Sequence, residues 1–254
     1  MSHFSVAVFT KELGQSIGDL LAPYDENLKV APYVSRTKAQ LIQDERDFLQ
    51  GAYERSKDHP DGPAEDILER MKETDEEIYQ RATKNMTENL NENGDYISTR
   101  NPNSKWDWWT IGGRWGGLLI TKVSVRKAKL TKSKTYEQCN AAFAADIDFE
   151  TMRRREAEEL RPYEVAMKSS LYKESYMRER FPTEDEYVKR LTNFSTYAVV
   201  TPDGNWHEPG EMGWFGISGA SPEAEREWEL SYYDRFTKPA IENNWFITIV
   251  DCHI

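Results

Sequence analysis

Tryptophan and glycine are concentrated in one short stretch, KWDWWTIGGRWGG, at residues 105–117. The stretch holds four of the eight tryptophans of the chain and four glycines. Gly112-Gly113 can supply the positive φ angles of a two-residue hairpin turn, so the sequence predicts a strand before this turn and a return strand over residues 114–121. Side chains alternate along the first strand. One face carries Trp106, Trp108 and Thr110, and the other carries Asp107, Trp109 and Ile111.

This aromatic stretch has two interpretations. As the floor of a pocket, it offers tryptophan faces that stack on planar groups, glycines that let a ligand approach the backbone, and Arg114, which can make a bidentate contact to phosphate or carboxylate. As part of the core, it is an aromatic hairpin in which Arg114 pairs with Asp107. The pocket interpretation gives as ligand-binding residues Trp106, Asp107, Trp108, Trp109, Gly112, Gly113, Arg114 and Trp115.

Charge and cysteine content limit the classes of protein to which the chain can belong. The 254 residues carry a net charge of −11, which argues against broad nucleic-acid binding. The sequence shows no apolar run long enough to span a bilayer and no signal peptide. Cys139 and Cys252 form neither a disulfide framework nor a metal motif. We therefore expect a cytoplasmic protein with reduced thiols, whose length fits a single α+β domain over residues 1–254.

Capping signals and apolar periodicity place the main elements. Thr37 and Gln40 form a capping box for a helix that reaches Lys57, and Pro63 opens a second helix that reaches about Met86, so residues 37–86 are expected to be a helical hairpin insertion. A second charged helical segment covers residues 143–192, and a later helix begins with Ser221 as its N-cap and Pro222 at its first position. Strands are expected at residues 3–10, 96–99, 118–134, 196–201, 205–208 and 245–254.

These elements predict an α+β fold. We expect a mainly antiparallel sheet formed by both termini and the central hairpins, flanked by charged helices. In this arrangement residues 96–99 pair beside the tryptophan hairpin, and residues 118–134 form a charged edge strand.

Candidate chemistry lies at the end of the last strand. Alternation places Asp251 and His253 on one face, where a carboxylate and an imidazole can orient a general base or bind a metal. His3 lies nearby if the first and last strands pair. His207 forms a second small cluster with Glu208 and Glu211. In the alternative interpretation, each of these histidines is a hydrogen-bonded structural residue or a solvated strand end. No zincin, nucleophile-elbow, P-loop or dinucleotide-binding motif occurs, and the sequence leaves open whether a metal or cofactor is bound.

Several segments together resemble an uncharacterised family of proteins found largely in phages and other mobile elements. These segments are SHFSVAVFT, LLAPYDEN, NPNSKWDWWTIGGRW, VVTPDGNWHEPGEMGWFG and TIVDCHI. The resemblance implies an origin and a shared site, but no activity. It implies that the site contains His3, Trp106, Asp107, Trp108, Arg114, Trp206, His207, Trp214, Asp251 and His253. The charged helical segments lie outside the resemblance.

The sequence supports three functional hypotheses. The first is a phage-encoded accessory protein that acts in the host cytoplasm and binds a small anionic or nucleotide-like ligand; action against host defence is one biological form of it. In this hypothesis Trp108, Trp109 or Trp214 stacks on the base and Arg114 neutralises phosphate. The second is a nucleotide hydrolase or lyase in which His253, oriented by Asp251, acts with His207 or His3. The third is an inhibitor whose charged helices bind a host protein. A homo-oligomer is compatible with each.

Overall fold

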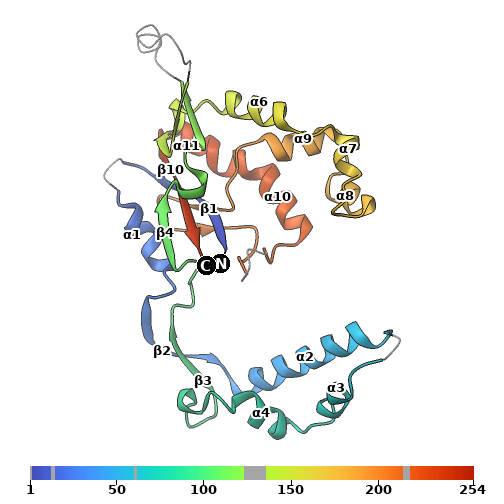
Figure 1. Ribbon diagram of the computed structural model, residues 1–254. Coiled ribbons are helices and arrows are strands. Elements are labelled where there is room, and N and C mark those ends of the chain that lie inside the picture. Colours follow the sequence, from blue (N-terminus) through green and yellow to red (C-terminus); the bar gives the residue numbers. More distant parts are fainter. Residues whose placement is uncertain (1, 13–14, 60–61, 123–135, 214–217) are drawn as a thin grey trace. The chain divides into compact units, whose positions relative to one another are not determined.

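The computed structural model describes residues 2–12, 15–59, 62–122, 136–213 and 218–254 (Figure 1). The chain divides into two compact units, Met1–Leu28 with Pro102–Ile254, and Lys29–Asn101. The α+β class predicted from the sequence is confirmed, with a mainly antiparallel sheet and flanking helices. Among the described residues, no helix is both long enough and apolar enough to cross a bilayer.

The first unit is built on a six-stranded sheet whose centre is formed by the first and last strands. The strand order is β4 (Trp108–Ile111), β10 (Phe246–His253), β1 (His3–Thr10), β8 (Ala198–Val200) and β9 (Trp206–His207), and β7 (Ala141–Phe143) also pairs with β10. Only β1 and β8 are parallel. The antiparallel register places His3 opposite His253, so the first and last strands pair as expected (Figure 1).

Both faces of β1 and β10 are buried, which explains their nearly continuous apolar sequences. One face contributes Ala7, Phe9, Ile247 and Ile249 to a core with Trp228, Tyr232 and Phe236. The other face contributes Phe4, Val6, Val8, Val250 and Cys252 to a core with Leu20, Leu21 and Trp106. Helices therefore pack on both sides of the two strands.

Helices and short helical turns of the first unit surround this sheet. They are α1 (Ile17–Leu21), η1 (Ala22–Tyr24), η3 (Gly113–Trp115), η4 (Ala144–Asp146), α6 (Phe149–Glu159), α7 (Tyr163–Met167), α8 (Glu174–Arg180), α9 (Glu184–Thr192), α10 (Pro222–Tyr232), η6 (Tyr233–Thr237) and α11 (Lys238–Glu242). The predicted cap of α10 is confirmed, because the Ser221 hydroxyl accepts a hydrogen bond from the backbone N–H of Ala224. The predicted helix from residue 143 begins later, because β7 occupies residues 141–143.

The predicted tryptophan hairpin is wrong. Strand β4 pairs with β10, and the next strand, β5 (Leu119–Lys122), pairs with β6 (Tyr136–Cys139) in a separate two-stranded sheet. Gly112 and Gly113 do have positive φ angles of 75° and 51°, but they lead into the 3₁₀ turn η3 instead of a two-residue hairpin. The apolar β10 is a better partner for β4 than a glycine-rich return strand. Residues 123–134 of the expected edge strand lie outside the described residues.

The described part of the second unit contains a two-stranded antiparallel ribbon and three α-helices. Its elements are β2 (Lys29–Arg36), α2 (Lys38–Ser56), α3 (Glu65–Arg70), α4 (Asp75–Thr83), η2 (Thr87–Asn89) and β3 (Tyr96–Arg100). The capping box of Thr37 and Gln40 is confirmed. The expected continuous helix over residues 63–86 is wrong, because Thr74 and Glu77 form a second capping box that starts α4. Strand β3 pairs with β2 and not with the tryptophan stretch.

Candidate active site with two histidine–carboxylate pairs

The first histidine–carboxylate pair joins the central strands of the sheet. Atom Nδ1 of His3 lies 2.8 Å from Oδ1 of Asp251. The second carboxylate oxygen, Oδ2, accepts a hydrogen bond of 2.9 Å from the backbone N–H of Arg114 in η3. Asp251 is only 2% exposed, and these two donors satisfy a carboxylate that burial would otherwise disfavour. Asp251 therefore fixes both the His3 ring and the start of η3.

The second pair joins the end of β10 to the residue that precedes β4. Atom Nδ1 of His253 lies 2.6 Å from Oδ1 of Asp107. The backbone N–H of Asp107 also donates to the carbonyl oxygen of His253 at 2.9 Å. The sequence predicts that Asp251 orients His253, but the structure gives each histidine a different carboxylate. The alternative pairing of Asp107 with Arg114 is not the arrangement observed.

The two imidazole rings lie next to each other, with centroids 5.0 Å apart and an angle of 76° between their planes. A carboxylate oxygen can only accept a hydrogen bond, so Nδ1 of each ring carries the hydrogen. In a neutral ring, Nε2 is then the unprotonated nitrogen that can accept a proton or bind a ligand. The arrangement supplies two oriented imidazoles that can act on one bound group.

Trp108 forms one wall beside the histidines. Its ring stacks on His253, with centroids 5.2 Å apart and a plane angle of 16°, and it meets His3 edge to face at 5.3 Å. Trp108 is nevertheless 43% exposed. An indole with exposed surface next to two polar rings can stack on a planar ligand.

The site is the polar end of a core face. Ile247 and Ile249 of β10 belong to the core that includes Trp228 and Tyr232, and alternation carries the same face onward to Asp251 and His253. The cross-strand register adds His3 opposite His253, and Trp108 from β4 also lies opposite His253. The shared face expected for Asp251 and His253 thus agrees with the observed contacts.

Glycine at position 113 is required by the closeness of η3 to Asp251. A Cβ atom at Gly113 would lie 2.3 Å from Oδ2 and 2.4 Å from Cβ of Asp251, and the φ angle is positive. At Gly112, a Cβ would lie 2.5 Å from the side-chain nitrogen of Asn140. Gly113 thus lets the backbone approach a carboxylate of the site, and Gly112 lets it approach the Asn140 amide.

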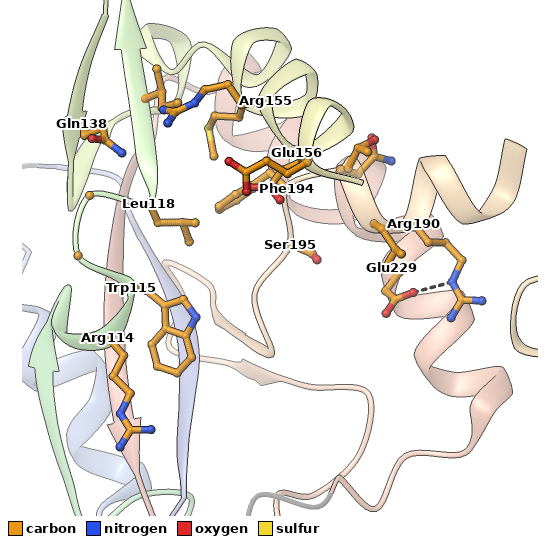
Figure 2. Close-up of a pocket in the computed structure, with 18 residues that line it drawn as sticks. Arg114, Trp115, Leu118, Gln138, Arg155, Glu156, Arg190, Phe194, Ser195 and Glu229 are labelled. Carbon is orange, nitrogen blue, oxygen red and sulfur yellow. Dashed lines mark hydrogen bonds and ion pairs between the residues drawn. The ribbon is translucent and has the colours of Figure 1, made fainter. Parts of the chain in front are cut away.

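Arg114 combines an anchored backbone with an exposed side chain. Figure 2 shows the side chain extending alongside β10, away from Leu118, in the direction in which β10 runs toward His253. No salt bridge of its guanidinium is found within the described part of the chain. A cation is therefore available to an anionic ligand near the histidines.

The other tryptophans do not share this position. Trp106 is buried in the core with Leu21, to whose carbonyl oxygen its Nε1 donates at 3.2 Å. Trp109 and Trp206 pack against the same core, whereas Trp115 packs against the core on the opposite face. The tryptophan pocket expected from the sequence is therefore divided between two sides of the sheet. Trp214 lies outside the described residues.

His207 also lies apart from the two pairs. It is on β9, which is separated from β1 by β8, and its Nε2 is 3.3 Å from the Thr201 hydroxyl oxygen. Burial, together with the charge of Arg235, lowers the pKa of His207. Glu208 and Glu211 instead bind Lys105 Nζ, at 2.8 and 3.3 Å.

Two contacts escaped the sequence analysis because each joins distant segments. Asp107 was identified as a ligand-binding residue but not as the partner of His253. Asn140 was not identified at all, although its Oδ1 accepts a 2.7 Å hydrogen bond from the backbone N–H of Gly117. Knowledge of the strand register would have identified the contact between Asp107 and His253. No sequence signal marks the contact between Asn140 and Gly117.

The candidate active site lies at one end of the sheet. It contains two imidazoles, two carboxylates, an exposed indole and an exposed guanidinium. Comparisons of this chain with protein-family models, with curated proteins and with solved structures find no match. The chemistry of this site is therefore the basis for a functional proposal.

Proposed function

We propose that the protein binds a small anionic, nucleotide-like ligand at the two histidine–carboxylate pairs and breaks a phosphodiester bond in it. His3 and His253 serve as general acid and general base. The observation that carries this proposal is the pair of imidazoles, 5.0 Å apart, each oriented through Nδ1 by its own carboxylate. If the role were purely structural, one histidine–carboxylate contact would be enough.

The chemistry follows from the Nε2 atoms, because the carboxylates occupy the Nδ1 atoms of both rings. One neutral imidazole takes the proton of the attacking hydroxyl group or water, and the other, protonated, gives a proton to the oxygen that leaves phosphorus. Imidazole can fill either role near neutral pH. Asp107 and Asp251 hold the rings in the required tautomer and stabilise the imidazolium form, in the same way that a carboxylate supports histidine in hydrolytic triads.

Binding is supplied by two neighbouring groups. Trp108 presents exposed indole surface on which a nucleobase can stack. Arg114 presents a guanidinium that can contact two phosphate oxygens at once. With a net charge of −11, the protein as a whole repels polyanions, so this local cation favours a small ligand over long nucleic acid.

The resemblance to phage proteins suggests a biological setting for this activity. A phage-encoded accessory protein in the host cytoplasm would remove a nucleotide signal on which host defence depends. Cleavage would achieve this at low protein concentration, whereas binding alone would require one protein molecule for each signal molecule. This setting rests on the resemblance, and the chemistry of the site does not depend on it.

The test is incubation of the purified protein with linear dinucleotides, cyclic dinucleotides and cyclic mononucleotides, followed by chromatography and mass spectrometry of the products. We expect cleavage of at least one phosphodiester by the wild type and its loss in His3→Ala and His253→Ala. His207→Ala is the matched control and keeps the activity. A nucleotide that binds but is recovered unchanged would show that the acid–base assignment is wrong and that the protein is a binder.

A further inference from the structure

A cavity of about 520 Å³ adjoins the histidine pairs through η3. Figure 2 shows it between η3, the β5 region, α6 and the segment that leads from α9 to β8. Arg114 and Trp115, consecutive residues of η3, both line it. The backbone of Arg114 also binds Asp251, which binds His3. One short turn thus contributes to both the cavity and the candidate active site.

The part of the cavity next to η3 is aromatic and apolar. Trp115, Leu118, Met152 and Phe194 line it, and all four contribute to or pack against the core that includes Tyr232. Phe194 already contacts the rings of Phe149 and Tyr232, whereas Trp115 has no aromatic ring contact within the described residues. Its indole is therefore the surface in this cavity that can accept a planar ring.

The lining of the cavity carries a small excess of negative charge. Three carboxylates, those of Glu156, Glu159 and Glu229, line it beside the guanidinium groups of Arg155 and Arg190. The Nε atom of the buried Arg190 lies 2.5 Å from Oε2 of Glu229 (Figure 2), whereas its Nη2 has no hydrogen-bond partner among the described residues. In contrast, the Arg114 side chain points out of the cavity, along β10. A ligand with one neutral planar end and one anionic end would therefore place the planar end beside Trp115 and the anionic end at Arg114.

A neutral polar group completes the lining. The hydroxyl oxygen of Thr192 is buried and has no hydrogen-bond partner among the described residues, and Thr192 lines the cavity. Asn193 and Gln138 also line it. Hydroxyl and amide groups match the ring nitrogens and exocyclic groups of a nucleobase, which both donate and accept hydrogen bonds.

From these contacts we infer that the cavity is a subsite for a nucleobase of the same ligand whose phosphate is held by Arg114 and processed by the two histidines. Trp115 is the stacking residue of this subsite. The inference rests on the proposed function, which it extends by assigning part of the substrate to the cavity. Trp108 then faces the other side of the scissile phosphate, so the ligand class is one with a base on each side, a dinucleotide.

The first test compares the binding of adenosine, guanosine, cytidine and uridine 5′-monophosphates with that of ribose 5-phosphate, by calorimetry. We expect at least one nucleotide to bind about tenfold more tightly than ribose 5-phosphate, which is the usual effect of stacking one base. Trp115→Leu should remove this difference and leave the affinity for ribose 5-phosphate unchanged. Trp245→Leu is the control, because Trp245 packs against the same core without lining this cavity.

Each outcome decides the inference. Equal affinity for ribose 5-phosphate and every nucleotide, or equal losses in the two tryptophan variants, would overturn the subsite, while phosphodiester cleavage that requires His3 and His253 would leave the proposed function intact. If no phosphate compound bound and no phosphodiester were cleaved, the proposed function would fail and the subsite with it.

Discussion

Atom Nδ1 of His3 lies 2.8 Å from Oδ1 of Asp251, although the two residues are 248 positions apart. The contact exists because the first strand pairs antiparallel with the last, with Ser5 opposite Asp251 and His3 opposite His253. Asp251 thereby reaches the histidine of the next pair on the same face of the sheet, two residues further along β1. The second oxygen of its carboxylate holds η3, so one buried side chain links the imidazole to the glycine-rich turn.

Replacing Asp251 with asparagine should damage both stability and activity. The carboxylate accepts hydrogen bonds from His3 and from the backbone N–H of Arg114, but an amide has only one acceptor oxygen, so one buried donor loses its partner. The expected cost is about 1–3 kcal/mol of unfolding free energy. If the amide nitrogen faces His3, the ring must adopt the other tautomer and can no longer act as a base through Nε2. Urea denaturation and nitrogen NMR of the His3 ring measure these two effects; an unchanged tautomer with full activity would contradict the role given to Asp251.

Gly113→Ala should destabilise the protein more than positive φ alone explains. A new Cβ would meet Asp251 at 2.3 Å, in addition to the roughly 1–2 kcal/mol that a left-handed conformation costs an L-residue. Gly204→Ala is the matched control, because Gly204 also has a positive φ, but its nearest neighbour to a new Cβ is Leu20 at 4.0 Å. Chemical denaturation of both variants measures the difference. Equal losses of unfolding free energy in the two variants would mean that η3 moves away from Asp251 without a further loss of stability.

Activity should survive metal removal. Both carboxylates of the site are bound to imidazole Nδ1 atoms, at 2.8 Å for Asp251 and 2.6 Å for Asp107. Acid–base catalysis by the two histidines needs no metal. We therefore expect the same phosphodiesterase rate before and after treatment with a chelator. A rate lost on chelation and restored by a divalent cation would assign the histidines to metal binding.

His207 should make folding less favourable in mild acid. Burial and the nearby Arg235 lower its pKa in the folded protein from the ordinary value of 6.5, so below that pH the unfolded chain binds more protons than the folded one. The free energy of unfolding contributed by this residue therefore falls as the pH falls through the unfolded pKa. Thermal or urea unfolding of wild type and His207→Gln across pH 5 to 8, the range in which an ordinary histidine titrates, isolates the contribution. The variant should show a shallower decrease toward low pH, and parallel curves would contradict the assignment.

Local signals in the sequence predicted local structure well. Thr37 with Gln40 and Ser221 with Pro222 mark helix starts, because a cap depends on residues only a few positions away. The face shared by Asp251 and His253 follows from alternation along one strand. By contrast, the hairpin assigned to the stretch around Gly112-Gly113 was wrong, because the partner of β4 is decided by competition among distant strands.

The same limit applies to the candidate site. Six residues singled out from the sequence lie at one end of the sheet. They are His3, Asp107, Trp108, Arg114, Asp251 and His253. Their pairing depends on the registers of β1 with β10 and of β10 with β4, which no local pattern specifies. The register of β4 places Trp109 on the face opposite Trp108, and Trp106, which precedes β4, is buried in the same core as Trp109. Composition alone therefore overestimated the number of tryptophans at the site.

The most direct test is the phosphodiesterase rate of His3→Ala, His253→Ala and the double variant, measured on the substrate that the nucleotide panel identifies. If the two imidazoles act on one phosphate as acid and base, each single variant should lose about 10²–10⁴-fold in kcat. The double variant should then be little slower than either single variant, because the histidines work as a unit. If the folded wild type cleaves this substrate and the single variants cleave it at the same rate, the account is contradicted.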